Sequence, residues 1–262
     1  MPDSVAHAVI GGSGLYSLFD EPSTVSDIRT PYGAARISIG ELDGRRLAFL
    51  PRHGSGHTVA PHLINYRANI WALASLGVRS IVSTAAVGGL HPDYPVGSLV
   101  LTDQYLDRTS GRADTFYDGD SVQHLASADP FCRALHDAAA DALGDEVIAT
   151  GTVAVIQGPR FSTRAESEWF RAAGAHIVNM TLYPEVPLAA ELSVGTVNLA
   201  FVTDGDAAVS DEPVTAELVF ARLREAQPRI IRSIRSVIAA IPADYRARDL
   251  IDPSAVAAVL AR

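Results

Sequence analysis

Two aspartates separated by one residue, Asp204 and Asp206, are the residues of this chain whose types and spacing point most directly to chemistry. They follow residues 196–202, a short, β-branched and largely apolar run that is typical of a buried strand. Ligands of α/β proteins gather where such strands end, and residues two apart on an extended chain point to the same side. The two carboxylates would then accept hydrogen bonds from a nitrogen heterocycle, and a protonated one could also donate. For an isolated Asp-Gly-Asp segment a solvated turn is the better interpretation, so the rest of the chain must decide.

Two other predicted strand ends carry groups that suit an anion. Residues 11–14, Gly-Gly-Ser-Gly, follow a predicted strand at residues 6–10, and their backbone N–H groups and the Ser13 hydroxyl could meet a phosphate. This segment lacks the third glycine of the dinucleotide fingerprint, and a tight turn explains it equally well. Arg52 and His53 follow a second predicted strand, where Arg52 could donate two N–H groups to a phosphate and His53 a third.

The histidines of this second loop also allow a metal site or an ordinary polar loop. His53, His57 and His62 are close in sequence, but no cysteine or carboxylate flanks them at ligand spacing and no His-Glu-x-x-His motif is present. Anion binding is therefore the better prediction than a metal, and no metal site is expected.

Three more segments at predicted strand ends or in loops complete the set. Residues 84–89 are small and could turn backbone donors toward a ligand, Phe161 could stack on a planar base, and Met180 and Thr181 follow another strand with a soft apolar surface and a hydroxyl. Each is explained by core packing when taken alone. Together they favour a phosphate group held beside a base, and no arrangement suggests a covalent nucleophile, because Cys132 lies in a predicted helix.

Composition limits the classes of partner. The chain has 262 residues, 48% of them hydrophobic, with 21 basic and 30 acidic residues and a formal charge of -9. Without a basic cluster, nucleic acid and anionic membranes are not expected partners. A single cysteine fits a reducing compartment, and neither a signal peptide nor an 18-residue apolar run is evident, so a cytoplasmic protein is expected.

Predicted strands and helices alternate along the chain without an evident linker. This pattern predicts one α/β domain over residues 1–262, with a mixed, mainly parallel sheet flanked by helices. The segment at residues 105–127 reads as a long polar loop, and Pro228 predicts a kink or break in a long helix at residues 214–240. The other predicted strands lie at residues 35–39, 46–51, 80–85, 98–102 and 147–156, and the other helices at residues 65–76, 130–143, 163–173 and 184–192.

As an ordered set, these motifs resemble the trimeric purine nucleoside phosphorylase family. The resemblance covers residues 9–241 and is strongest to the branch that acts on 5'-methylthioadenosine. It implies a single α/β domain, a homotrimer and an enzyme that uses inorganic phosphate as co-substrate, without metal or organic cofactor. The segments that carry it are residues 11–15, 52–57, 117–119, 158–167, 179–185 and 203–206.

The resemblance also assigns residues to parts of the site. The purine would be bound by Asp204 and Asp206, with Asp204 nearest N7, and Phe161 would contact the base and Met180 the ribose. His124 would reach the 5' pocket of a neighbouring subunit. Phosphate would be held by Ser13, Arg52, His53, Ala85, Ala86 and Thr181, and the 5' pocket would be lined by Ala216, Val219 and Phe220.

The chemistry of these residues favours adenine as the base. A carboxylate accepts the N6 donor of a 6-aminopurine, whereas a 6-oxopurine calls for an Asn-like donor. An acid at N7 would stabilise the leaving purine while phosphate attacks the sugar. The predicted reaction is phosphorolysis of 5'-methylthioadenosine to adenine and 5-methylthioribose 1-phosphate in purine and methionine salvage. Other 5'-deoxyadenosines, or 6-oxopurine nucleosides such as methylthioinosine and inosine, remain alternative substrates, and a hydrolase or a non-catalytic nucleotide-binding module are the competing classes.

Overall fold

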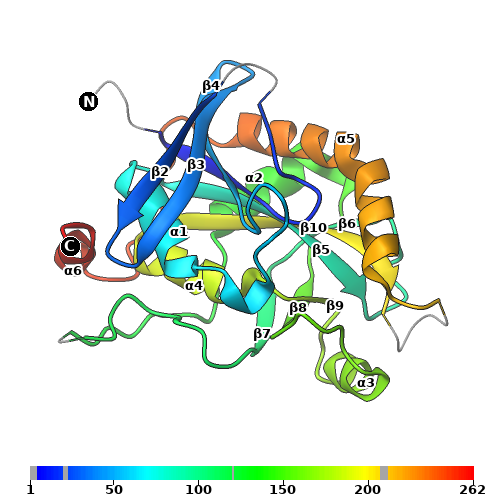
Figure 1. The fold of residues 1–262 in the computed structure, drawn as a ribbon. Helices are drawn as coiled ribbons and strands as arrows, with labels where there is room; N and C mark the ends of the chain where they lie inside the picture. The colour runs from blue at the N-terminus through cyan, green and yellow to red at the C-terminus, as the bar shows by residue number, and fades with distance from the viewer. Residues whose placement is uncertain (1–4, 20–22, 120, 207–211) are drawn as a thin grey trace.

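A mixed β-sheet forms the centre of the molecule and brings the predicted site segments together (Figure 1). The computed structural model describes residues 5–19, 23–119, 121–206 and 212–262. Within these residues the sheet has ten strands in the order β2-β3-β4-β1-β5-β9-β8-β7, and β10 pairs with β5 and β6. The strands are β1 (His7–Gly11), β2 (Thr24–Thr30), β3 (Gly33–Leu42), β4 (Arg45–Pro51), β5 (Ser80–Gly89), β6 (Leu99–Leu101), β7 (Gln104–Arg108), β8 (Thr152–Ile156), β9 (Ile177–Asn179) and β10 (Gly195–Gly205).

Parallel pairing at the centre of the sheet explains why distant segments meet. Strand β1 lies between β4 and β5, and β5 pairs with β10, all in parallel register. Their carboxyl ends therefore lie at one edge of the sheet, as in other α/β folds. Strand β9 runs antiparallel to the end of β5, which places Val178 opposite Gly88 and delivers the residues after Asn179 to the same edge.

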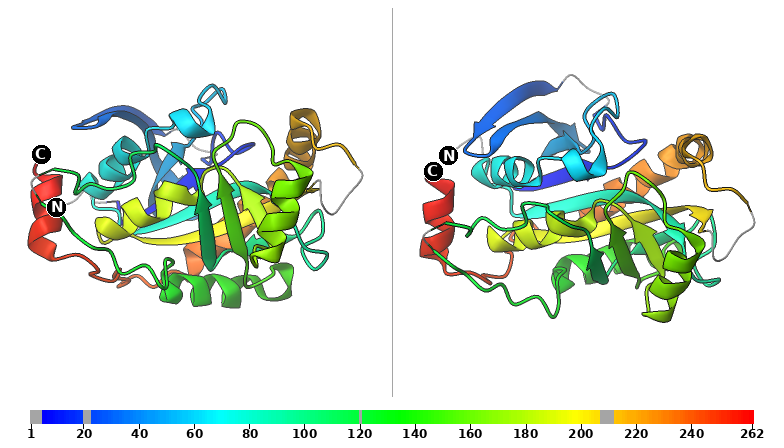
Figure 2. Two further views of the ribbon diagram at one scale, coloured as in Figure 1. Left: turned by 90° about the horizontal axis from the view of Figure 1, so that it is seen from below. Right: turned by 60° about the horizontal axis from the view of Figure 1, so that its bottom comes forward.

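Helices cover both faces of the central strands because alternate side chains point to opposite faces (Figure 2). Ala8 and Ile10 of β1 belong to the buried cluster that contains residues of α1, α4 and α6. Val9 belongs to the cluster that contains residues of α2 and α5. The helices are α1 (Tyr66–Ser75), α2 (Arg133–Leu143), α3 (Arg164–Ala172), α4 (Leu182–Glu191), α5 (Ala216–Ala240) and α6 (Pro253–Leu260), with 3-10 turns at Pro61–Leu63 and Gly144–Glu146.

The α/β fold with a mixed sheet is the predicted one, and local signals placed most of its elements. The hairpin turn at Asp43 and Gly44 joins β3 to β4, with positive φ at both residues. The Asn65 side chain caps α1 by accepting from the N–H of Ala68, and Thr163 forms a capping box with Glu166 at the start of α3.

Several predicted details were wrong. Strand β5 was predicted to end at Ala85 but continues to Gly89. Helix α5 was predicted to kink or break at Pro228 but runs through it as one helix. Strand β7 occupies the start of the predicted polar loop, and β2 and α6 were not predicted. Cys132 is the N-cap of α2 rather than a helical residue, and its sulfur accepts a hydrogen bond from the Tyr245 hydroxyl. None of the described helices has the length and apolarity to cross a membrane.

We expect Gly195→Ala to destabilise the fold. A Cβ at Gly195, at the start of β10, would lie 1.9 Å from the Tyr245 hydroxyl oxygen, so the buried Tyr245 ring would have to move and lose its bond to Cys132. Overpacking of this kind costs about 1–3 kcal/mol, which urea denaturation measures. Gly119→Ala is the matched control, since a Cβ there meets nothing within 4 Å. Equal stability of the two variants would contradict the expectation.

Candidate active site

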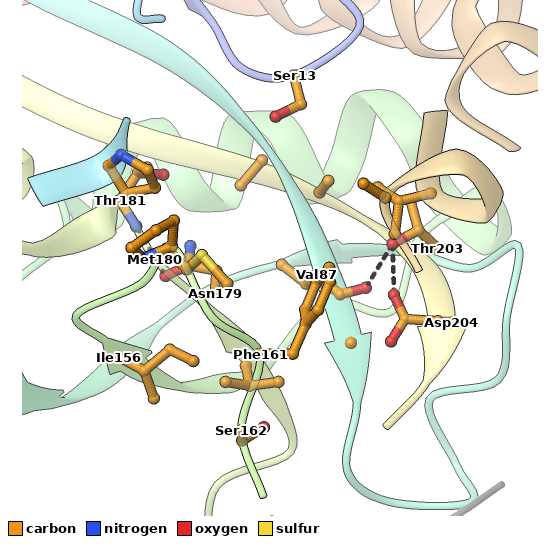
Figure 3. A pocket seen from close by; sticks show the side chains of 18 of the residues that line it. Ser13, Val87, Ile156, Phe161, Ser162, Asn179, Met180, Thr181, Thr203 and Asp204 are labelled. Carbon is orange, nitrogen blue, oxygen red and sulfur yellow. Dashed lines mark hydrogen bonds between the residues drawn. The ribbon is translucent and has the colours of Figure 1, made fainter. Parts of the chain in front are cut away.

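One cavity of about 230 Å³ lies at the edge of the sheet where these strands end (Figure 3). It brings together the predicted residues Ser13, Arg52, His53, Ala85, Ala86, Phe161, Met180, Thr181, Asp204, Asp206, Ala216, Val219 and Phe220. It is completed by His57, Pro61, Val87, Gly88, Ile156, Pro159, Ser162, Val178, Asn179 and Thr203, which were not assigned to the site beforehand. His124 is exposed and is not among the residues that line the cavity.

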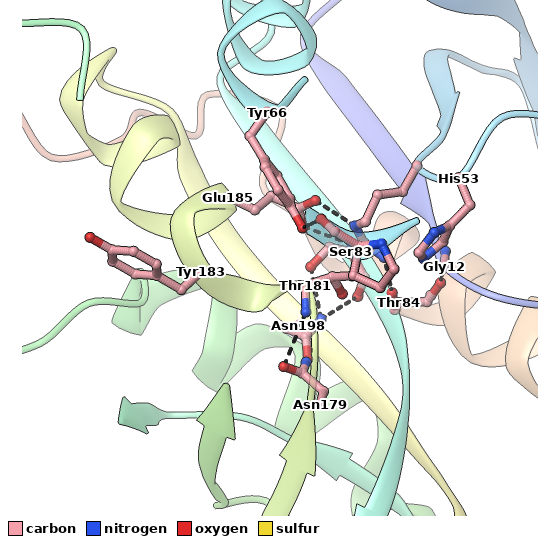
Figure 4. Close-up of polar contacts among 12 residues, drawn as sticks. Gly12, His53, Tyr66, Ser83, Thr84, Asn179, Thr181, Tyr183, Glu185 and Asn198 are labelled. Atoms are coloured by element: carbon pink, nitrogen blue, oxygen red, sulfur yellow. Dashed lines mark hydrogen bonds and ion pairs between the residues drawn. The ribbon is translucent and has the colours of Figure 1, made fainter. Parts of the chain in front are cut away.

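A buried ion pair joins Arg52, which lines one side of the cavity, to Glu185, which does not line it. Figure 4 shows the polar contacts around Glu185 and Thr84. Arg52 Nε and Nη2 donate to the two carboxylate oxygens of Glu185 at 2.6 and 2.7 Å, and Nη1 donates to the Thr84 carbonyl at 2.8 Å. Burial alone would lower the pKa of Arg52, but Glu185 raises it and the net shift is upward, so the guanidinium stays charged. A guanidinium has five N–H donors, and two of them are not used by these contacts.

The glycine-rich loop after β1 lies against this pair. Gly12 N donates to the Thr84 hydroxyl at 2.9 Å. A Cβ at Gly12 would lie 2.5 Å from the Thr84 carbonyl oxygen and 3.0 Å from Arg52 Nη1. Glycine is therefore required here for close approach of three chain segments, which places Ser13 at the cavity wall beside Arg52.

His53 enters the site as a neutral ring. Its Nδ1 lies 2.8 Å from the Val59 carbonyl, and because a carbonyl only accepts, Nδ1 carries the proton. Burial lowers the pKa of His53 to about 4, so at neutral pH its Nε2 has a lone pair. His53 was expected to add a third donor for phosphate, but in this form it is an acceptor, which suits the P–OH of a hydrogen phosphate or a sugar hydroxyl.

The two aspartates face the other side of the cavity, and both are buried. A hydrogen bond links the Thr203 hydroxyl to Asp204 Oδ2 at 2.8 Å, and the Ser162 hydroxyl donates to Asp206 Oδ2 at 2.9 Å. Asp206 Oδ1 is buried with no partner in the described part of the chain. A solvated turn would expose both side chains, so that interpretation of the Asp-Gly-Asp segment is wrong.

Burial raises the pKa of Asp204 from 3.8 to about 6. The Thr203 hydrogen bond opposes this shift, and the negative charge of Asp206 adds to it. A Cβ at Gly88 would lie 3.0 Å from Asp204 Oδ1, so the small residue on the neighbouring strand makes room for this carboxyl. Asp204 can therefore carry a proton into the cavity at mildly acidic pH and donate it.

Apolar groups fill the space between and beyond these polar walls. The Phe161 side chain is 39% exposed and Met180 lies near it at the cavity. At the third wall, Val219 and Phe220 of α5 face inward, and the Phe220 ring meets the His57 ring edge-on at 5.0 Å between centroids. The cavity therefore suits a ligand with an anionic group, a planar nitrogen-containing ring and an apolar substituent.

The other motifs of the loops have structural roles. Glu166 closes the capping box of α3 and pairs with Arg160, so it does not face the cavity. Among the described residues, no group of three or more His, Cys, Asp or Glu side chains is arranged to hold a metal ion. Glu185 ends residues 179–185, one of the segments that carry the family resemblance, but nothing in its spacing connects it to Arg52, so this ion pair was not predicted.

The chain is similar in sequence and in structure to known phosphorylases. A family model described as the phosphorylase superfamily matches residues 6–239. The S-methyl-5'-thioadenosine phosphorylase of Thermofilum pendens is 45% identical over 251 residues, covering 93% of this chain and 95% of the relative. The purine nucleoside phosphorylase of Streptomyces coelicolor is 46% identical over 249 residues, covering 90% and 89%. The solved structure of methylthioadenosine phosphorylase from Schistosoma mansoni in complex with adenine has a TM-score of 0.87 at 34% identity and covers 98% of both chains.

We expect Glu185→Gln to unfold more easily, because it leaves the Arg52 charge buried without its counter-ion. Removing one partner of a buried pair costs about 3–5 kcal/mol. Glu166→Gln is the matched control: it also weakens a bidentate pair with an arginine, but Arg160 is 65% exposed, and exposed pairs contribute about 0–1 kcal/mol. Urea denaturation of both variants measures the difference, and equal losses would contradict the role of the buried pair.

The raised pKa of Asp204 predicts a pH-dependent stability difference. The neutral carboxyl favours the folded state, so its contribution is fully present below the unfolded pKa of 3.8 and is lost as the pH rises through about 6. Asp204→Asn stays neutral at every pH. Its free energy of unfolding, relative to the unsubstituted protein, should therefore increase by about 1–3 kcal/mol between about pH 4 and pH 7. A constant difference across this range, measured by urea denaturation, would show that Asp204 titrates normally.

Proposed function

The chain belongs to the phosphorylase superfamily, and we propose that its reaction is the phosphorolysis of S-methyl-5'-thioadenosine to adenine and 5-methylthioribose 1-phosphate. The observation that carries this proposal is that one cavity holds the Arg52 guanidinium on one side and two buried carboxyls on the other, one of them with a raised pKa. Such an arrangement separates a place for an anionic nucleophile from a place for a basic leaving group.

Phosphate is proposed to occupy the wall formed by the ends of β1, β4 and β5. Arg52 supplies charge and two unused N–H donors, and the hydroxyls of Ser13 and Thr181 add further donors. The lone pair of His53 Nε2 would accept the remaining P–OH proton, which fixes the orientation of the phosphate. Backbone at Ala85 and Ala86 completes this proposed subsite.

Purine is proposed to lie against Asp204 and Asp206, with Phe161 on its face. As the bond from C1' to N9 breaks, its electron pair enters the purine, and Asp204 donates a proton to N7. The sugar acquires positive charge, which the phosphate stabilises before one of its oxygens forms the new bond to C1'. The base is thus released neutral, and the proton lost by Asp204 is regained from solvent.

The apolar wall of α5 is proposed to hold the 5' substituent. Val219 and Phe220 provide carbon surface, and Met180, which lines the same cavity, is proposed to contact the ribose. A methylthio group transfers to such a surface with a favourable free energy, whereas a 5'-hydroxyl would lose its water there, with the His57 ring beside Phe220 as the polar neighbour. This wall supports methylthioadenosine over adenosine as the preferred substrate.

Adenine release tests the proposed reaction directly. Purified protein should release adenine from S-methyl-5'-thioadenosine only when inorganic phosphate is added, and chromatography should detect 5-methylthioribose 1-phosphate in equal amount. Inosine and methylthioinosine serve as comparison substrates and should react much more slowly. Release that is equally fast without phosphate would identify a hydrolase, and faster reaction of inosine would identify a 6-oxopurine enzyme.

We expect Asp204→Asn to lower turnover of methylthioadenosine by about 10²–10⁴-fold, the usual contribution of a positioned general acid. The amide removes the proton donor at N7 and replaces an acceptor for N6 with a donor. The ratio of methylthioinosine to methylthioadenosine turnover should rise in the same variant. Wild-type turnover of methylthioadenosine by Asp204→Asn would show that another group supplies the proton.

A homotrimer is proposed as the assembly, with His124 completing a neighbouring subunit's 5' pocket. Its support is that His124 is exposed within one chain, on a segment that does not line this chain's own cavity. Light scattering should give the mass of three chains, and His124→Ala should raise the KM for methylthioadenosine while leaving the KM for phosphate unchanged. A fully active monomer would contradict this assembly.

No cofactor enters the proposed mechanism, since phosphate is a co-substrate and the proton comes from a side chain. Dialysis against a chelator should therefore leave the rate unchanged. The single cysteine, Cys132, is buried and fits a reducing compartment, so the cytoplasm is the proposed location.

A further inference from the structure

A β-bulge lies directly before Asp204. The pairing of β10 with β5 passes from Val202 opposite Val87 to Asp204 opposite Gly88, so Thr203 is the extra residue. In a regular strand, successive side chains point to opposite faces, yet Thr203 and Asp204 both line the cavity. The bulge explains this, because it changes the direction of the side chains that follow it.

The bulge takes the carbonyl of Thr203 out of the regular ladder, and a buried carbonyl needs a donor. Arg222 of α5 supplies it: Nη1 donates to the Thr203 carbonyl at 2.7 Å. Its other nitrogen, Nη2, donates to both carboxylate oxygens of Glu212 at 3.2 and 3.0 Å, which holds the guanidinium in place. Arg222 itself does not line the cavity.

We propose that Arg222 is a positioning residue that holds the bulge and thereby directs the Asp204 carboxyl into the cavity. The link passes through one residue, because Thr203 receives Arg222 at its carbonyl and contacts Asp204 through its hydroxyl (Figure 3). Arg222 also lies on α5 three residues after Val219, and residues at this spacing are neighbours on one helix face. The same contact therefore fixes α5, which carries the proposed 5' wall, relative to the carboxyl that serves the base.

Arg222 also acts on Asp204 through its charge. The charged groups that act on Asp204 are Asp206 and Glu212, which raise its pKa, and Arg222, which lowers it. Without Arg222 the two acidic groups act unopposed, and the proton is held more tightly. A residue that only stabilised the fold would leave this titration unchanged, so the titration separates positioning from stability.

The test compares Arg222→Met with Arg229→Met. Arg229 is a matched control because it lies on the same helix and also donates to two backbone carbonyls, those of Gly97 and Glu146, away from the cavity. Two readouts are measured: phosphorolysis of methylthioadenosine, and the pH dependence of adenine binding by calorimetry without phosphate. The first readout rests on the proposed reaction, and the second rests only on the proposed binding of adenine beside Asp204.

Arg222→Met should lower kcat about tenfold or more, with an unchanged KM for phosphate, because a small displacement of the acid is costly. The pH at the midpoint of the change in adenine affinity should rise by about half a unit or more. Arg222→Lys keeps the charge but loses the planar guanidinium that bonds Thr203 and Glu212 together. Its pH midpoint should therefore return toward that of the unsubstituted protein while kcat stays reduced. Arg229→Met should lose stability without moving the midpoint.

Glu212→Gln keeps the test decisive if Arg222→Met does not fold. Glu212 is exposed, and its loss should move the midpoint down, opposite to Arg222→Met. The role of Arg222 is overturned if neither substitution moves the midpoint, or if Arg229→Met moves it equally. Absence of adenine release by the unsubstituted protein would instead overturn the proposed function, and the adenine-binding midpoints would still decide the role of Arg222.

Discussion

The buried ion pair between Arg52 and Glu185 is the interaction on which the cavity depends. It joins the end of β4 to α4, and through the Thr84 carbonyl it also holds β5. A buried guanidinium is tolerable only with a counter-ion and satisfied donors, and Glu185 supplies the first while leaving two N–H groups for a ligand. Glu185 therefore keeps the Arg52 guanidinium charged at the cavity wall of a protein whose formal net charge is -9.

Burial also determines the protonation of the opposite wall of the cavity, but there it favours the neutral form of an acidic side chain. Among the described residues, Asp204 has no cationic side chain in direct contact, and burial raises its pKa to about 6. This carboxyl can therefore hold and release a proton, whereas the Arg52 guanidinium stays charged. Strands β4, β1, β5 and β10 are parallel neighbours in this order, so Arg52 after β4 and Asp204 near the end of β10 lie at the same edge of one sheet, with β1 and β5 between them. A short distance along the sheet edge thus separates a site for an anion from a site for a leaving base.

Strand ends could be predicted from sequence because β-branched runs followed by glycine or polar residues are local signals. Asp204, Arg52 and Ser13 were found in this way, and parallel pairing brought them together. The pairing of Glu185 with Arg52, the place of Asn179 in the cavity wall and the bulge at Thr203 could not be predicted, because they depend on which segments meet across the sheet. The reversal of His53 from donor to acceptor depends on its contact with Val59, six residues away, which spacing alone does not reveal. Strand β2 was missed because its residues are mostly exposed and polar, so no apolar alternation marks it.

Two buried atoms in the cavity wall explain how the base could be selected. Asp206 Oδ1 and Asn179 Nδ2 are both buried without partners in the described residues, one an acceptor and the other a donor. Each such group costs about 1–3 kcal/mol until it is paired. A ligand that offers a donor to the first and an acceptor to the second recovers both costs, and a ligand with the opposite pattern recovers neither. Selectivity then follows from groups that the protein itself leaves without hydrogen-bond partners, so the stability lost by burying them becomes affinity for a ligand that matches them.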